Sequence, residues 1–144
     1  MENIIRHVAS SKLVAPVESD LSLGPLRKAI PRYVAPVGTF GPGASRSAKA
    51  GDYIALYANG LGATSPAAPA GAVLTTAYAL DDLSRVKITI GGYDVPVLYA
   101  GLAGAGLYQI NIQVPSGFLG TGELPVLMMV SGQPTQGCVT LNFQ

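Results

Sequence analysis

The sequence predicts an all-β fold, an antiparallel β-sandwich of about seven strands that follows an N-terminal arm. Three observations predict this fold. From Gly51 to Gln144 the chain consists of short apolar runs whose residues alternate between two faces, as in half-buried strands. The 18 glycines and 11 prolines fall mainly between these runs, where they act as turn signals. No segment has the period of a helix, and the connections are too short for parallel crossovers.

The alternation places each strand. The expected strands are residues 52–58, 73–78, 85–90, 93–100, 107–114, 124–130 and 139–144. The clearest of them, residues 85–90, places its three aliphatic side chains on one inward face and ends at Gly91-Gly92. A Gly-Gly pair favours the type I′ turn of a tight hairpin, because both residues take a positive φ. Ser131-Gly132 predicts a second hairpin.

The segment before these strands has a different character. We assign residues 1–31 to an arm or linker and residues 32–144 to the sandwich domain. Residues 38–51 are rich in Gly, Pro, Ser and Ala and are expected to form a loop. The tetrapeptide Val-Ala-Pro-Val occurs at residues 14–17 and 34–37, either by chance or because two segments make equivalent edge-strand contacts.

The composition narrows the range of partners. Hydrophobic residues make up 49% of the chain and charged residues 12%, against the quarter or so that is usual for charged residues. The net charge of +1 and the absence of a basic patch argue against nucleic acid and acidic membranes as partners. The longest apolar run, residues 124–130, has the length of a strand and argues against membrane insertion. A neutral, apolar surface favours self-association.

The N-terminal residues and the single cysteine give information about the cellular compartment of the protein. Glu2 follows Met1, and no apolar segment with a cleavage site comes after them, so we expect an intracellular chain or else a mature chain or fragment. The single Cys138 excludes an internal disulfide, a Cys-rich zinc site and a redox pair. Because it precedes Val139 in an apolar strand, we interpret Cys138 as a small buried hydrophobic residue.

Three candidates for catalytic or ion-binding sites are weak. His7, the only histidine, lies in the arm, whereas a Ser-His-Asp triad needs a histidine held by a packed scaffold. Asp81-Asp82, with Asp94 further on, lacks the alternate spacing of calcium-binding loops and reads as a solvated loop. Gly60-Leu61-Gly62 is not followed by the helix of a phosphate-binding loop. We therefore expect no catalytic residue, no metal, no cofactor and no enzymatic activity.

One strand suggests a carbohydrate platform. Gln109, Asn111 and Gln113 share one face of the strand at residues 107–114, and the chain has seven tyrosines. Amides suit sugar hydroxyls and aromatic rings suit sugar faces. Against this hypothesis, the chain has no tryptophan, and Tyr108 falls on the opposite face from the amides. The competing interpretation is an ordinary solvated face.

Another strand suggests a contact surface. Leu127 and Met129 alternate with Val126 and Met128, so this strand is apolar on both faces. In a two-layer sandwich one face of each sheet should be exposed to solvent, where apolar side chains are unfavourable. The chain's own arm or loops, or another molecule, should therefore cover Leu127 and Met129. The arm residues that could join such an interface are Ile4, Ile5, Val8, Val14 and Val17. In one version, residues 4–17 pair with an open sheet edge of a neighbouring copy and build a filament.

Several motifs resemble a known family. The segment GDYIALYANGLG at residues 51–62 resembles the opening of an immunoglobulin-like module of the IPT/TIG type. A closer resemblance is to a C-terminal domain of unknown function in secreted proteins of Acidobacteria of the Solibacter type. It is carried by VKITIGG at 86–92, VPVLYAGL at 95–102 and, most specifically, GLYQINIQVP at 106–115. The resemblance implies an immunoglobulin-like sandwich, an extracellular location and no catalytic residues to transfer.

Two functional hypotheses follow. The first is a non-catalytic, extracellular structural or adhesive module that acts through protein contacts, with other copies of itself among its partners. The alternative is a polysaccharide-binding accessory module of a secreted protein, with Gln109, Asn111 and Gln113 as its binding face. An enzyme ranks last, because the chain offers no nucleophile–base pair.

Overall fold

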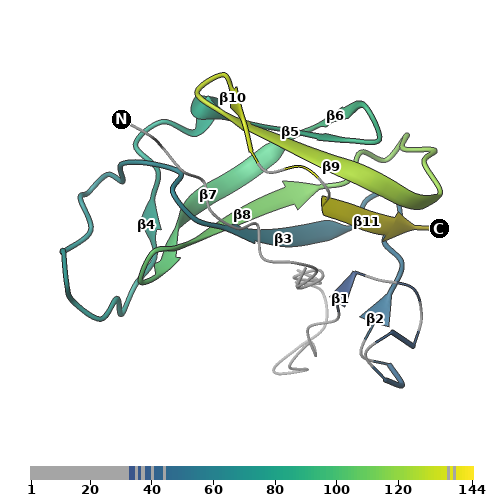
Figure 1. The fold of residues 1–144 in the computed structure, drawn as a ribbon, viewed down its shortest axis with the longest axis horizontal. Helices are drawn as coiled ribbons and strands as arrows, with labels where there is room; N and C mark the ends of the chain where they lie inside the picture. Colours follow the sequence, from purple (N-terminus) through teal and green to yellow (C-terminus); the bar gives the residue numbers. More distant parts are fainter. Residues whose placement is uncertain are drawn as a thin grey trace, which may run out of the picture.

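The computed structural model describes residues 33–144, apart from 35, 37, 40, 44, 136 and 138. The chain folds into two antiparallel sheets that lie one above the other (Figure 1). The first sheet has the order β10-β9-β5-β6, with β11 also paired to β9, and the second has the order β3-β8-β7-β4. The predicted all-β, two-sheet architecture is confirmed.

The strands of the first sheet are β5 (Val86–Ile90), β6 (Tyr93–Val95), β9 (Gly122–Val130), β10 (Gln133–Pro134) and β11 (Val139–Phe143). Those of the second are β3 (Tyr53–Ala58), β4 (Tyr78–Ala79), β7 (Val97–Gly104) and β8 (Leu107–Gln113). A two-stranded parallel pair, β1 (Tyr33–Val34) and β2 (Ser45–Arg46), lies beside them, and a 3₁₀ turn, η1 (Leu83–Arg85), precedes β5.

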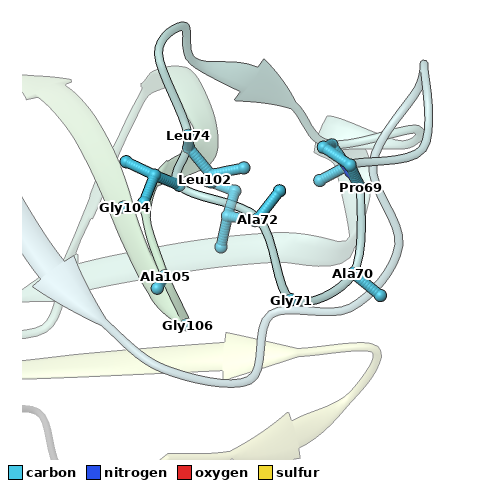
Figure 2. A pocket seen from close by; sticks show the side chains of 11 residues that line it. Pro69, Ala70, Gly71, Ala72, Leu74, Leu102, Gly104, Ala105 and Gly106 are labelled. Atoms are coloured by element: carbon cyan, nitrogen blue, oxygen red, sulfur yellow. The ribbon is translucent and has the colours of Figure 1, made fainter.

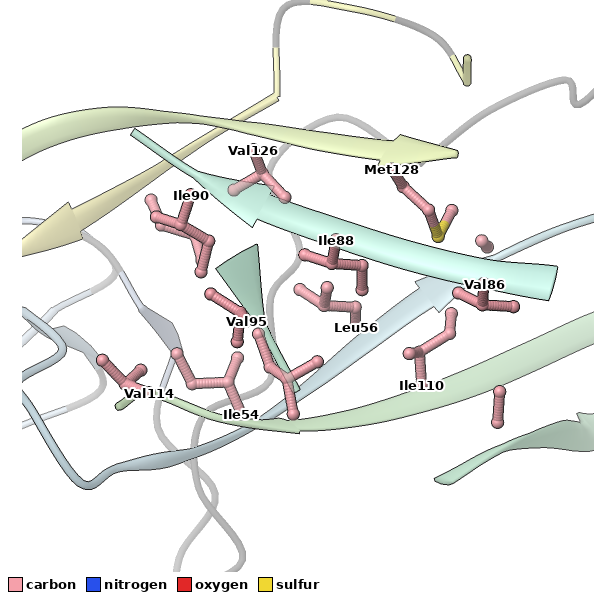
Figure 3. Close-up of a cluster of buried hydrophobic side chains, with 14 of the residues drawn as sticks. Ile54, Leu56, Val86, Ile88, Ile90, Val95, Ile110, Val114, Val126 and Met128 are labelled. Atoms are coloured by element: carbon pink, nitrogen blue, oxygen red, sulfur yellow. The ribbon is translucent and has the colours of Figure 1, made fainter. Parts of the chain in front are cut away.

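The core fills the space between the two sheets, and Figure 3 shows its side chains pointing toward one another from both layers. Alternate residues are buried along β5 and at the end of β9, as the alternation predicts. The largest fully buried side chains are Ile54, Leu61, Ile88, Ile90, Ile110, Ile112, Val114 and Leu141. The opposite faces of the same strands therefore point outward, which decides where a binding surface can lie.

Both predicted hairpin turns are present. Gly91 and Gly92 have φ values of +57° and +86° and join Ile90 directly to Tyr93 across the β5–β6 ladder. Ser131 and Gly132 also take positive φ, at +52° and +79°, and connect β9 to β10. Positive φ at both turn positions is the geometry that matches the twist of a two-residue hairpin.

The extended run expected at residues 93–100 is two strands that belong to different sheets. The break falls at Pro96, which has no N–H to donate and is tolerated where a ladder ends. β6 therefore pairs with β5 in the first sheet, and β7 pairs with β8 in the second. This crossing brings Tyr99 onto the same sheet as the amides of β8.

The prediction of a strand at residues 73–78 is wrong for most of its length. Only Tyr78–Ala79 pairs with β7, and the Val73 side chain is 89% exposed. The preceding prolines and Gly71 favour a loop. Thr64 closes part of it, because its hydroxyl donates to the Pro66 carbonyl at 3.0 Å and accepts from the Ala68 amide at 3.1 Å.

The loop expected at residues 38–51 contributes to the fold near its end. Ser45, Ser47 and Ala48 are buried. Ala48 bridges in parallel to Phe143, with its amide donating to the Asn142 carbonyl at 2.8 Å. Pairing at the edge of β11 satisfies backbone groups that a free loop would leave to water. The sandwich thus includes short parallel contacts besides its antiparallel sheets.

Candidate binding face

The three amides predicted on one face of β8 do point away from the core. Ile110 and Ile112, which alternate with them, are completely buried. Gln109, Asn111 and Gln113 are partly exposed on the outer face of the β3-β8-β7-β4 sheet. This outer face is called the amide face below.

Two tyrosines of β3 lie beside these amides on the amide face. The antiparallel register pairs Tyr57 with Gln109 and Tyr53 with Gln113, while Ala55 pairs with Asn111. Tyr53 is exposed and Tyr57 is partly exposed. Directly paired side chains on one face of a sheet lie close enough to contact each other. The face therefore carries aromatic rings next to amides, and the pairing identifies Tyr53 and Tyr57, among the seven tyrosines of the chain, as neighbours of the amides.

A third tyrosine reaches the amide face from the other side. On β7, Tyr99 pairs with Asn111 and Gly101 pairs with Gln109. The Tyr99 ring leans along β7 so that its tip lies over Gly101, where an added Cβ would be 2.8 Å from Tyr99 Cζ. Gly101 is buried although it faces outward. The glycine is therefore the reason that the ring can lie down on the sheet.

Hydrogen bonds orient the amides along β8. The Gln109 Nε2 donates to Asn111 Oδ1 at 2.8 Å, and the Tyr57 hydroxyl approaches Gln109 Oε1 at 3.5 Å. Among the described residues, Gln113 makes no side-chain hydrogen bond, and the Asn111 amide hydrogens have no acceptor. The face thus keeps donors and acceptors available for a ligand.

The amide face carries no formal charge. None of β3, β4, β7 and β8 contains an Asp, Glu, Lys or Arg residue. The first sheet differs, since Lys87, Asp94 and Glu123 lie on its strands. An uncharged face of tyrosines and amides suits an uncharged, hydroxyl-rich ligand better than an ionic one.

Tyr108 lies on the opposite face of β8 from the amides, as predicted. Its hydroxyl donates to the Gly62 carbonyl at 2.6 Å. Gly60 and Gly62 both have positive φ, and Leu61 between them is buried. The Gly60-Leu61-Gly62 segment is therefore a structural turn anchored by Leu61 and Tyr108.

The predicted contact surface on β9 is also partly exposed. Leu127 is 46% exposed and Met129 is half-buried on the outer face of the first sheet. Thr89 and Lys87 of β5 are their directly paired neighbours. The Leu127 side chain is thus an exposed apolar group beside polar ones.

Two of the three candidate aspartates, Asp81 and Asp82, serve local structure. Asp82 caps η1 by accepting from the Ser84 amide at 2.9 Å and from the Ser84 hydroxyl at 2.6 Å. These bonds, the hydroxyl one first, hold the pKa of Asp82 below its ordinary value. Asp81 forms an ion pair with Arg85, and Asp94 is exposed on β6. Among the described residues no three His, Cys, Asp or Glu side chains are grouped to hold a metal ion.

One hollow of about 640 Å³ lies between the Pro-Ala loop and the β7–β8 hairpin. Residues 68–74 line one side of it, and Leu102, Gly104, Ala105 and Gly106 line the other (Figure 2). Its walls are apolar side chains, from alanine to leucine, and backbone, without a titratable group.

Several sequence predictions lie outside the described residues. These are Ile4, Ile5, Val8, Val14 and Val17 of the predicted arm, together with His7 and Cys138. Within the part of the chain that the structure describes, no helix has the length and apolar character to cross a bilayer.

Comparison of the chain with protein-family models, with curated proteins and with solved structures finds no significant match in any of the three. The resemblance to the IPT/TIG-type domain remains a prediction from residues 51–62 and 86–115.

Proposed function

We propose that this protein is a non-catalytic module that binds an uncharged polysaccharide on its amide face. The observation behind the proposal is the convergence of three tyrosines with three amides on a sheet face whose strands carry no charge. Aromatic rings can pack against the apolar faces of sugar rings, and amides can donate to and accept from sugar hydroxyls. Following the resemblance to secreted proteins, we propose that binding takes place outside the cell.

The rigidity of the face supports the proposal. Its side chains project from paired strands, the Gln109 amide donates a hydrogen bond to Asn111, and the Tyr99 ring lies over Gly101. Ordering a free side chain on binding costs about 0.5–1.5 kcal/mol, and side chains that are already ordered avoid most of that cost.

A polysaccharide pull-down tests the proposal. Insoluble cellulose, chitin, xylan, mannan and mixed-linkage β-glucan are incubated with the wild type, with Asn111→Ala and with Tyr99→Ala. We expect at least one polymer to retain the wild type and to lose both variants. Tyr93→Ala is the matched control, because Tyr93 is exposed but lies on the first sheet. If no polymer retains the wild type, the proposal is wrong.

Leu127 favours a second proposal, a structural or adhesive module that acts through protein contacts. Its exposure beside Met129 leaves an apolar group on a sheet face that a second molecule can cover. Light scattering across a range of concentrations tests this. Mass that rises with concentration in the wild type, but not in Leu127→Ser, supports a contact at this face; a monomer at all concentrations excludes self-contact.

Strand donation is a specific version of that second proposal. Within the described residues, β3 pairs with a single strand, β8. A sheet edge of this kind can accept an added strand, and residues 4–17 of a neighbouring copy are the proposed donor. Deletion of residues 1–17 should then abolish polymers and leave the sandwich folded. Polymers that survive the deletion would rule out this version.

A further inference from the structure

We propose, building on the polysaccharide binding proposed above, that the ligand is an extended sugar chain that lies along β8 and contacts its three amides in turn. β8 is an inner strand, with β3 on one side and β7 on the other. Gln109, Asn111 and Gln113 therefore form a row along the middle of the amide face. The tyrosines flank this row on both sides.

The length of the row sets the size of the ligand. Residues that share a strand face are about 7 Å apart, so the row from Gln109 to Gln113 spans about 13 Å. This span is longer than one sugar ring. A monosaccharide can therefore contact only part of the row, whereas an extended oligosaccharide can contact all three amides.

The two ends of the row have different numbers of neighbouring tyrosine rings. Tyr57 pairs with Gln109, and the tip of Tyr99 lies over Gly101, which also pairs with Gln109. The Gln113 end has one paired ring, that of Tyr53. We infer that the Gln109 end, with two rings, binds the first sugars and that Tyr53 and Gln113 bind only chains long enough to reach them.

Small residues flank the row at two positions. Ala55 faces outward opposite Asn111 on β3, and Gly101 faces outward opposite Gln109 on β7. Ala55 is only 4% exposed, and the tip of the Tyr99 ring lies over Gly101. The free donors of Asn111 lie between Ala55 on β3 and Tyr99 on β7, at the middle of the row.

Calorimetry with an oligosaccharide series tests this arrangement. Oligomers of increasing length, from the monosaccharide upward, are prepared from whichever polymer the wild type retains. The affinity should rise with length until the chain covers the row and should then level off. Tyr53→Ala and Gln113→Ala should weaken the longest oligomer about tenfold and leave the shortest oligomer that binds unchanged. Asn111→Ala should weaken every oligomer.

The calorimetry has its own control, and the results that would overturn the proposed arrangement differ from those that would refute polysaccharide binding. Gln133→Ala removes an exposed glutamine from β10, on the first sheet, and should change no affinity. A disaccharide that binds as tightly as the longest oligomer overturns the arrangement, and so does a Tyr53→Ala variant that weakens all lengths equally. Either result leaves polysaccharide binding itself intact, whereas a failed pull-down refutes the proposed function.

Discussion

The side chain of Tyr99 lies over the backbone of Gly101, two residues further along β7. A Cβ at position 101 would collide with the Tyr99 hydroxyl and would lie 2.6 Å from the carbonyl oxygen of Tyr78 on β4. Glycine inside a strand destabilises it by about 0.5–1 kcal/mol relative to alanine. Here the glycine makes room for an aromatic ring that covers it, which links the stability of the sheet to the shape of the amide face.

Gly101→Ala should therefore affect both stability and binding. The added methyl group must displace the Tyr99 ring and press on the β4 backbone, so we expect a loss of about 1–3 kcal/mol in the free energy of unfolding. Urea unfolding measures this change, and the polysaccharide pull-down measures the binding. Adding Tyr99→Ala should recover only part of the stability, because the contact with the Tyr78 carbonyl remains. A Gly101→Ala variant as stable as the wild type contradicts this packing.

Alanine substitutions at two adjacent residues of β8 should have different effects, one on stability and the other on polysaccharide binding. Ile110 is fully buried, so Ile110→Ala leaves a cavity and should lower the free energy of unfolding by about 2–5 kcal/mol. Asn111 faces outward, so Asn111→Ala should change it by only about 0.5–1 kcal/mol while abolishing polysaccharide binding. Urea unfolding of both variants compares them. Similar losses in the two variants would mean that the faces of β8 are wrongly assigned.

Asp82 should make stability depend on pH in the acidic range. Its pKa in the folded chain is lowered by the bonds from the Ser84 hydroxyl and amide, so the folded state favours the carboxylate. That contribution is present above the pKa of the unfolded chain and is lost as the pH falls through the lower, folded pKa. NMR titration of the Asp82 carboxyl should show the lowered pKa, and Ser84→Ala should raise it toward the ordinary value. An unchanged Asp82 pKa in Ser84→Ala would show that Ser84 is not the cause.

Leu127 offers a test of the first sheet as a contact surface. Because its side chain is about half exposed, Leu127→Ser should change the free energy of unfolding by less than the 2–5 kcal/mol typical of buried leucines. If the face mediates association, the same variant should weaken it at constant stability. Thr89→Ala, at the paired position on β5, is the control for general effects on this sheet. A large loss of stability in Leu127→Ser would indicate a structural role for this side chain.

The local sequence pattern was sufficient to predict the core-facing residues and the hairpin turns. Val86, Ile88 and Ile90 alternate strictly and are followed by Gly91-Gly92, so both the inward face and the hairpin could be predicted. Pairing between distant strands is not a local property. The alternation put Tyr53 and Tyr57 on one face of β3, but nothing in it showed that β3 lies beside β8, which adds their rings to the amides.

Pro96 and the serines near residue 45 show a second limit of local pattern. The proline reads as an interruption of one extended run, yet the chain changes sheets there and so delivers Tyr99 to the amide face. Ser45 and Ser47 read as loop residues because of their polarity, yet both are buried, and the Ser47 hydroxyl bonds to the Asn142 amide oxygen. In both cases a partner far along the chain decides the structure.

Asn111→Asp separates the shape of the amide face from its hydrogen-bond donors. The substitution changes little in size, and the aspartate oxygen can still accept the bond from Gln109 Nε2. It removes the two amide hydrogens that are free to meet a sugar hydroxyl, and it adds a negative charge to an uncharged face. We expect near-normal stability and polysaccharide affinity lowered about tenfold or more, measured by calorimetry on the polymer that the wild type binds. Full affinity in this variant would mean that Asn111 contributes shape alone, and that the tyrosines carry the binding.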